Sequence, residues 1–182
     1  MANNNHLIDK YIDALLVEAA LRKNELNSET ITTVYLGGGT PSLLSSTQLS
    51  KLVNGLKKVF DFSDVEEFTI EVNPDDVTPE CIQQSKSLGI NRVSMGVQSF
   101  SDEDLRFINR RHTAKQATDA IHIIKEAGID NISIDLIYGI PGQNFEIWKN
   151  NVDTAILLSV RHISAFTLMY EEGTRLSVMR SL

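Results

Sequence analysis

Segments rich in β-branched residues alternate with amphipathic segments along almost the whole of this 182-residue chain. Five segments have the composition of β-strands, and they cover residues 33–36, 68–72, 92–97, 132–137 and 162–168. Between them, apolar residues recur at three- and four-residue spacing, which is typical of helices. Parallel strands joined by helices produce this alternation. The sequence therefore predicts an α/β fold with a parallel sheet, either a partial or complete barrel or a doubly wound sheet.

Local signals mark the starts of several predicted helices. Ser45 with Gln48, and Thr113 with Gln116, have the spacing of a capping box, and Pro79 follows a threonine in the order preferred at a helix start. A helix is also expected before the first strand, where one stripe contains Leu7, Ile8, Tyr11, Ile12, Leu15, Leu16, Ala19 and Ala20. No linker or shift in composition divides the chain, so residues 1–182 are expected to form one domain, with barrel units from about residue 7 to 175.

Composition excludes several classes of protein. The net charge of −7 argues against binding to nucleic acid or to an anionic membrane, since both surfaces are negative. No apolar run approaches the ~20 residues that cross a bilayer, and the first residues lack the pattern of a signal peptide. The single cysteine, Cys81, cannot form an internal disulfide. These features favour a protein of the cytoplasm.

Glycines and polar residues gather where the predicted strands end. They are Gly37, Gly38, Gly39 and Thr40 after the first strand, Glu71 and Asn73 at the second, Gln98 and Ser99 at the third, Asp135 in the fourth and residues 170–172 after the fifth. Open sheets and barrels of α/β proteins place ligand sites at the carboxyl ends of their strands. The sequence therefore predicts a ligand site at this edge of the sheet.

The individual residues leave alternatives open. The glycine run could turn backbone N–H groups toward a ligand or form only a tight turn, and it lacks the pattern of a Walker or dinucleotide-binding loop. Glu71 and Asp135 would suit ribose hydroxyls or an ammonium group, but each could also face outward or pair with a structural arginine such as Arg92.

Residues 109–112 (Asn-Arg-Arg-His) form a short basic cluster. A solvated charge run is the usual explanation, although an arginine here would suit bidentate recognition of a carboxylate. His112 could be a base, and a hydrogen-bonding structural role is favoured for it. For Cys81, a buried thiol that packs as a small apolar group is favoured.

Four short segments of the chain, taken in order, resemble one known family. They are residues 35–42 (Tyr-Leu-Gly-Gly-Gly-Thr-Pro-Ser), 71–74 (Glu-Val-Asn-Pro), 96–99 (Gly-Val-Gln-Ser) and 137–143 (Ile-Tyr-Gly-Ile-Pro-Gly-Gln), with Leu105, Arg110 and His112 between the last two. Together they resemble the oxygen-independent coproporphyrinogen III oxidase family of radical SAM proteins, including its haem-chaperone relative. The ending at residues 168–174 is closer to the chaperone-like branch.

The resemblance implies a three-quarter β/α barrel that binds S-adenosylmethionine (SAM) across its strand ends. It implies that Gly37, Gly38, Gly39 and Thr40 contact the methionyl amino group and that Arg110 pairs with the SAM carboxylate. Gln98 and Asp135 would face the ribose, and Glu71 would complete the polar end of the pocket. The family's reaction is reductive cleavage of SAM by a 4Fe–4S cluster, in the metabolism of porphyrin or haem. A haem-binding chaperone without oxidase activity is the alternative, and a barrel enzyme that binds a phosphorylated substrate is a more remote one.

The sequence departs from this family at the cluster. Three cysteine thiolates should hold it, in a loop after the first barrel strand, and this chain contains only Cys81. The expectation is therefore a shortened core whose first strand and cysteine loop are missing, with the 4Fe–4S cluster confined to the full-length parent. Such a chain should be inactive alone, with no catalytic or metal-binding residue of its own. The unpaired sheet edge should favour self-association.

Overall fold

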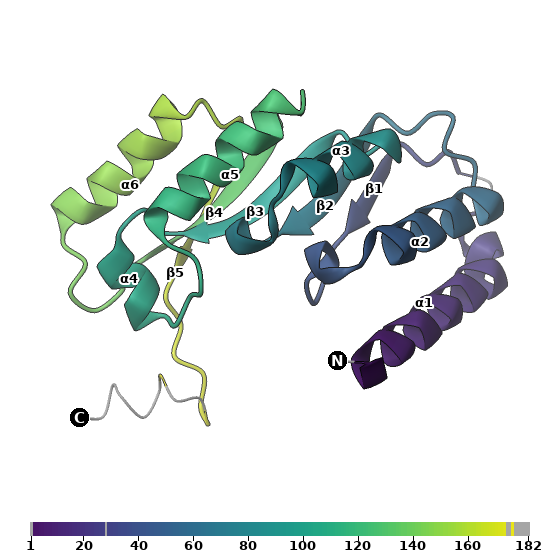
Figure 1. Ribbon diagram of the computed structural model, residues 1–182, viewed down its shortest axis with the longest axis horizontal. Helices are drawn as coiled ribbons and strands as arrows, with labels where there is room; N and C mark the ends of the chain where they lie inside the picture. The colour runs from purple at the N-terminus through teal and green to yellow at the C-terminus, as the bar shows by residue number, and fades with distance from the viewer. Residues whose placement is uncertain (1, 28, 174–175, 177–182) are drawn as a thin grey trace.

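The computed structural model describes residues 2–27, 29–173 and 176 and contains one sheet of five parallel strands (Figure 1). The strands are β1 (Thr33–Leu36), β2 (Glu67–Val72), β3 (Arg92–Gln98), β4 (Asn131–Tyr138) and β5 (His162–Thr167). Their spatial order is the same as their sequence order, β1-β2-β3-β4-β5. A doubly wound sheet reverses direction at a switch point, and no reversal occurs among these strands. The α/β class is confirmed, and the order is that of a partial barrel.

The helices are α1 (Ala2–Arg22), α2 (Ser46–Val59), α3 (Pro79–Ser87), α4 (Asp102–Phe107), α5 (Ala114–Glu126) and α6 (Phe145–Leu157). Three 3₁₀ turns accompany them: η1 (Lys23–Leu26), η2 (Pro41–Leu43) and η3 (Pro74–Asp76). Figure 1 shows α2, α3, α5 and α6 stacked along one side of the sheet. Both predicted capping boxes are confirmed, and Pro79 begins α3 as expected.

The two faces of the sheet differ in polarity. The face toward the helices is apolar and carries Phe68, Ile70, Val93, Met95, Ile132 and Ile134, each at most 2% exposed. The alternate positions carry Thr69, Glu71, Ser94, Gly96, Ser133 and Asp135, and the register places Glu71 beside Ser94 and Ser94 beside Ser133. Parallel sheets are usually apolar on both faces. Glu71 and Asp135 therefore belong to a continuous polar face instead of being isolated carboxylates in apolar strands.

The helix-to-strand joints are tied together by a ladder of lysines. Each ammonium group donates to a carbonyl at the end of the next stacked helix, and the pairs are Lys57 with Leu88 (2.7 Å), Lys86 with Ala127 (2.7 Å) and Lys125 with Leu158 (2.6 Å). The residue after each carbonyl has a positive φ, and it is a glycine at the first two joints and Ser159 at the third. Cations suit these helix ends because the last carbonyls lack intrahelical partners. The same helix-to-strand joint therefore recurs three times as one structural unit.

Helix α1 is present as predicted, but most of its apolar stripe is not buried. Ile12 is the buried member of the predicted stripe, whereas Leu7 is 62% and Tyr11 is 65% exposed. The helix packs on α2 and lies apart from the sheet in Figure 1. The period of the stripe identified the helix correctly, but it did not show that most of the stripe lines an open groove.

Candidate functional site

The first half of the site is built around Glu71 at the end of β2. Its carboxylate accepts a hydrogen bond from the Tyr35 hydroxyl (2.8 Å) and another from the backbone N–H of Gly38 (3.0 Å). A Cβ added to Gly37 would lie 2.8 Å from this carboxylate and 2.5 Å from the Tyr35 ring. Glycine at position 37 is therefore required by space. The structure thus brings the predicted glycine run and the predicted carboxylate together.

The second half of the site lies over Gly96 in β3. Nη2 of Arg110 donates to the Gly96 carbonyl (3.2 Å). A Cβ built on Gly96 would come within 2.8 Å of both Arg110 Nη2 and Gln98 Nε2, with Asn73 Oδ1 at 3.9 Å. Two predicted site residues from separate elements therefore converge on a cradle that any side chain at position 96 would fill.

Arg110 retains unused hydrogen-bonding capacity. Its Nε is buried and has no hydrogen-bond partner among the described residues. Burial lowers the pKa of the guanidinium from its ordinary value, and the nearby carboxylates of Asp75 and Asp135 partly oppose this effect. A half-buried cation with a free donor is suited to a bidentate carboxylate ligand.

Gln98 has an unusual backbone conformation. Its φ is +67°, and the β3–β4 register shifts between Met95 and Gln98, so the end of β3 forms a bulge. A non-glycine residue in the left-handed region costs roughly 1–2 kcal/mol. Bulges next to functional sites redirect a side chain, and this one places the Gln98 amide over Gly96.

Asp135 in β4 lies close enough to both halves of the site to interact electrostatically with each. Burial raises the pKa of its carboxyl, a hydrogen bond from Ser164 opposes the rise, and the negative charge of Glu71 adds to it. The charges of His162 and Arg110 lower it slightly. The row Glu71, Arg110 and Asp135 is therefore an alternating set of charges across the ends of β2, β3 and β4.

The raised pKa of Asp135 predicts a pH-dependent cost in stability. The folded state holds this proton to higher pH than the unfolded state, so ionisation destabilises the fold at neutral pH, and the penalty disappears below the unfolded pKa of about 3.9. The substitution Asp135→Asn is therefore expected to raise the free energy of unfolding at pH 7 and to have little effect near pH 3.5. Urea unfolding at both pH values measures this difference. An Asp130→Asn variant, changed at an exposed position, is the control. Equal effects of Asp135→Asn at both pH values would contradict the expectation.

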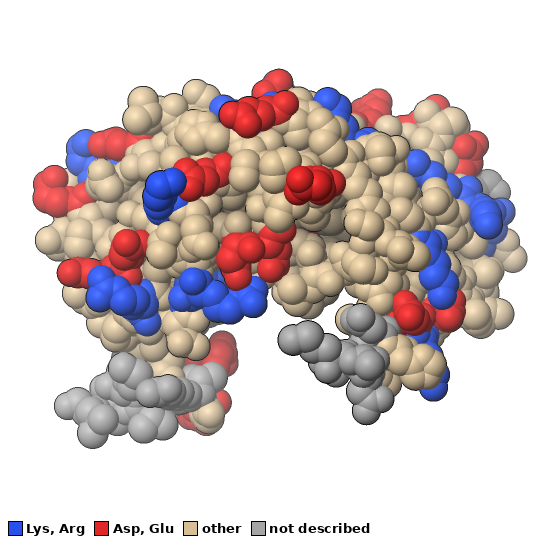
Figure 2. Space-filling view, in the orientation of Figure 1, with Lys and Arg blue, Asp and Glu red and all other residues tan. Residues whose placement is uncertain are grey.

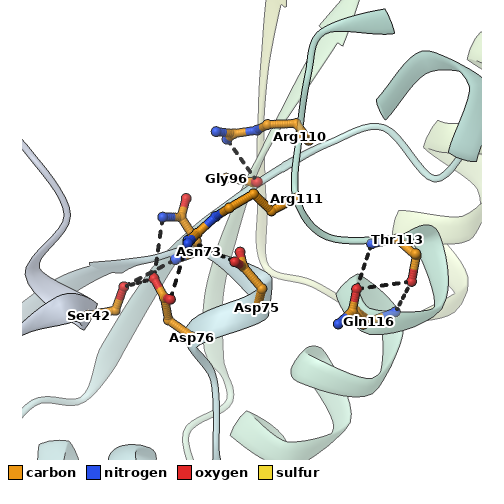
Figure 3. A network of polar contacts seen from close by, with 9 residues as sticks. All are labelled: Ser42, Asn73, Asp75, Asp76, Gly96, Arg110, Arg111, Thr113 and Gln116. Atoms are coloured by element: carbon orange, nitrogen blue, oxygen red, sulfur yellow. Dashed lines mark hydrogen bonds and ion pairs between the residues drawn. The ribbon is translucent and has the colours of Figure 1, made fainter. Parts of the chain in front are cut away.

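A polar network ties together the loops that surround this row (Figure 3). Asp76 accepts from the hydroxyl of Ser42 (2.9 Å) and from Nδ2 of Asn73 (3.4 Å). Nη2 of Arg111 pairs with Asp75 at 2.8 Å and with Asp76 at 3.5 Å. These contacts join η2, η3 and the segment before α5. Because Arg110 belongs to that segment, the network fixes the distance between its backbone and the end of β2.

Two hollows adjoin the row. A cavity of about 620 Å³ is lined by Gln98, Arg110, Phe107, Ile108, Ile137 and Leu168 among others. A groove of about 730 Å³ between α1, α2 and β1 includes Gly37, Gly38, Gly39 and Thr40. The glycine run and Arg110 therefore line different hollows, and Glu71 and Asp135 lie on the strands between them. We call Gly37, Gly38, Glu71, Gly96, Gln98, Arg110 and Asp135 the strand-end site.

The structure also places three further residues discussed from the sequence, Arg92, His112 and Cys81. Arg92 lies near Glu67 (3.6 Å) and donates to Thr69 (3.2 Å), so it is not the partner of Glu71 or Asp135. His112 is 3% exposed and its Nε2 contacts the Val97 carbonyl (2.9 Å), which confirms the structural role. Cys81 is half-buried, and burial raises the pKa of its thiol.

Sequence reasoning missed Tyr35, Ser94, Gly96 and Asp76 as parts of this region. Tyr35 lies two residues before the predicted site residue Gly37, and Gly96 and Ser94 lie two and four residues before Gln98. Counting back every second residue from each predicted site residue would therefore have found them. No comparable signal existed for Asp76, because its partners Ser42 and Arg111 come from two other loops.

The surface gives little support for a nucleic-acid interface. Figure 2 shows acidic and basic side chains interspersed over the face in view instead of one large basic patch. Among the described residues, no helix is long and apolar enough to cross a membrane, and no cluster of three metal-ligating side chains occurs.

Comparison with known proteins decides the family. Residues 5–155 match the family model described as the radical SAM superfamily. The chain belongs to the radical SAM superfamily. The resemblance read from its motifs is confirmed, and the partial barrel of parallel strands is the fold expected for it.

Two named relatives and one solved structure are similar to more than nine tenths of this chain. The heme chaperone HemW of Lactococcus lactis is 40% identical over 167 residues, which cover 92% of this chain and 43% of that protein. The heme chaperone HemW of Bacillus subtilis is 37% identical, with 92% and 44% covered. The structure of the radical SAM enzyme coproporphyrinogen III oxidase (HemN) of Escherichia coli superposes with a TM-score of 0.85 at 30% sequence identity. The superposition covers 98% of this chain and 41% of the HemN chain. The chain thus spans less than half the length of these relatives.

Proposed function

We propose that this chain is the SAM-binding core of a radical SAM, coproporphyrinogen III oxidase-like protein of haem or porphyrin metabolism. The observation that carries the proposal is the row of Glu71, Arg110 and Asp135 over the small residues Gly37 and Gly96. SAM carries a carboxylate, an ammonium group and a ribose, and this row offers a complementary group for each.

The residues fit the ligand in the following way. Arg110, with its free buried Nε, would hold the SAM carboxylate. The carboxylate of Glu71 and backbone carbonyls of the glycine run, from Gly37 through Thr40, would accept hydrogen bonds from the ammonium group. The carboxylate of Asp135 would accept hydrogen bonds from the ribose hydroxyls. The amide of Gln98 would donate hydrogen bonds to them. Ile137 and Phe107, which line the adjoining cavity, supply apolar surface beside this position.

The 4Fe–4S cluster does not fit the residues of this chain. Such a cluster is held by cysteine thiolates, whereas the chain contains one cysteine, in α3, whose thiol pKa is raised by burial. We propose that the cluster, which supplies the electron for cleaving SAM, belongs to the full-length parent. The part of the reaction assigned to this chain is to bind and orient SAM.

Calorimetric titration tests the proposal. SAM is expected to bind, and adenosine, which lacks the amino-acid end, is expected to bind at least tenfold more weakly because it makes no contact with Arg110 or Glu71. A sugar phosphate provides the comparison for the phosphate-binding alternative. Equal affinity for SAM and adenosine, or preference for the sugar phosphate, would overturn the assignment.

A haem-binding chaperone is the second candidate function. It is favoured by the identity of 40% to a protein named as a heme chaperone. Titration of the full-length parent with haem, together with an assay of coproporphyrinogen decarboxylation, separates the two: haem binding without decarboxylation favours the chaperone. Either function fits the proposed cytoplasmic location.

The edge of the sheet at β1 supports a proposal about assembly. Among the described strands, β1 pairs only with β2, so its outer edge is free to pair with another chain. We expect the average mass in light scattering to rise with protein concentration. A constant monomer mass over a hundredfold range of concentration would exclude this pairing.

A further inference from the structure

A cluster of buried polar side chains joins the end of β3 to α4 and α6. Ser99, Asp104 and Asn151 are 0%, 3% and 0% exposed. The Ser99 hydroxyl donates to Asp104 Oδ2 (2.7 Å) and accepts from Asn151 Nδ2 (3.0 Å). Buried polar groups require such partners, and a fully bonded network restrains the backbone that carries it.

The cluster binds the backbone just after Gln98, beside a tight turn that contains Gln98 itself. The N–H of Ser99 donates to the carbonyl of Val97 (2.8 Å), which closes a three-residue turn around the positive φ of Gln98. The same carbonyl contacts His112 Nε2 at 2.9 Å, and since a carbonyl can only accept, the imidazole donates. After the turn, the N–H of Phe100 donates to Asn151 Oδ1 (2.7 Å).

The same cluster reaches the loop after β4. Nε2 of Gln143 donates to Asp104 Oδ2 (2.7 Å), and its Oε1 accepts from the N–H of Gly139 (3.0 Å). The loops that follow β3 and β4 are therefore connected through a single buried carboxylate. None of these cluster residues belongs to the strand-end site.

We propose that Asn151 is a positioning residue of the strand-end site. From α6 it anchors Ser99 and Phe100, and so keeps Gln98 in the left-handed turn that directs its amide over Gly96. A left-handed turn at a glutamine is unfavourable in itself, so it persists only while the surrounding contacts hold it. The inference rests on the proposed function, because it assigns the held amide to the ribose of SAM.

A double-mutant cycle with Gln98 tests this role. Asn151→Ala is expected to weaken SAM binding about tenfold, although Asn151 does not line the site. Gln98→Ala is expected to weaken it by a similar factor, and the double variant is expected to be no worse than Gln98→Ala alone, because Asn151 acts through Gln98. Ile124→Val, a buried change in α5, is the control for a general loss of stability and is expected to leave affinity unchanged.

Hydrogen exchange of the Ser99 amide supplies a readout that does not depend on ligand. Asn151→Ala is expected to accelerate this exchange at least tenfold relative to Ile124→Val, because the turn around Gln98 opens. If Asn151→Ala does not fold, Ser99→Ala, which removes a single oxygen, is expected to give smaller changes of the same sign.

The outcomes separate the two proposals. If the unchanged chain binds SAM but Asn151→Ala binds equally well, the positioning role is overturned and the proposed function stands. The same follows if the fold-loss of affinity in the double variant is the product of the losses in the two single variants. If Ser99 exchange is unaffected, the positioning role is also overturned. If the unchanged chain does not bind SAM, the proposed function falls, and the role for Asn151 that rests on it falls with it.

Discussion

The substitution Gly96→Ala is expected to reduce SAM affinity about 100-fold or more while leaving the fold intact. The added Cβ would lie 2.8 Å from both Arg110 Nη2 and Gln98 Nε2, so both polar groups must move. Loss of a charge-assisted hydrogen bond and a neutral one corresponds to roughly 3 kcal/mol of binding free energy. Calorimetric titration with SAM measures the loss.

Stability is expected to change little in this variant, because the φ of Gly96 is not in the positive region and alanine suits a strand interior better than glycine. Gly55→Ala is the contrasting control. Its new Cβ would meet the Leu16 side chain at 2.5 Å in the contact between α1 and α2, away from the cradle over β3, so it should spare affinity. If Gly96→Ala retained full affinity, the cradle over β3 would not be the binding position.

The substitution Arg110→Met is expected to remove SAM binding without lowering stability. A guanidinium that binds a carboxylate through two donors contributes about 3 kcal/mol or more, so affinity should fall at least 100-fold. In the unliganded chain, burial lowers the pKa of the Arg110 guanidinium, and its buried Nε has no hydrogen-bond partner among the described residues. Replacing this arginine by methionine should therefore leave the free energy of unfolding unchanged or raise it.

Paired measurements of affinity and of urea unfolding check both halves of this expectation. Arg161→Met is the matched control, since Arg161 is exposed and lies just before β5, at the opposite end of the strands from the site. It removes the same charge and should leave affinity unchanged. A large loss of stability in Arg110→Met would show instead that Arg110 is a structural residue.

The sequence alone was sufficient for the class of the fold and for most element boundaries. Strand and helix periods and the capping boxes at Ser45 and Thr113 are local signals, and local signals depend only on residues close together in the chain. The motifs also identified the superfamily correctly. The expectation that polar residues would gather at one edge of the sheet followed from a general property of parallel strands, and the structure confirms that they do.

Only the tertiary structure decided which side chains meet. Glu71 accepts hydrogen bonds from Tyr35 in β1 and from Gly38 in the loop after it, and it is not paired with Arg92. Arg110 lies over Gly96, which is 14 residues away in the chain. The exposure of α1 and the hydrogen bond from the Phe100 N–H to Asn151, 51 residues away, were likewise invisible in the sequence. The physical reason is that periodicity reports the conformation of one segment, whereas contacts between segments depend on the register and bulges of the strands that carry them.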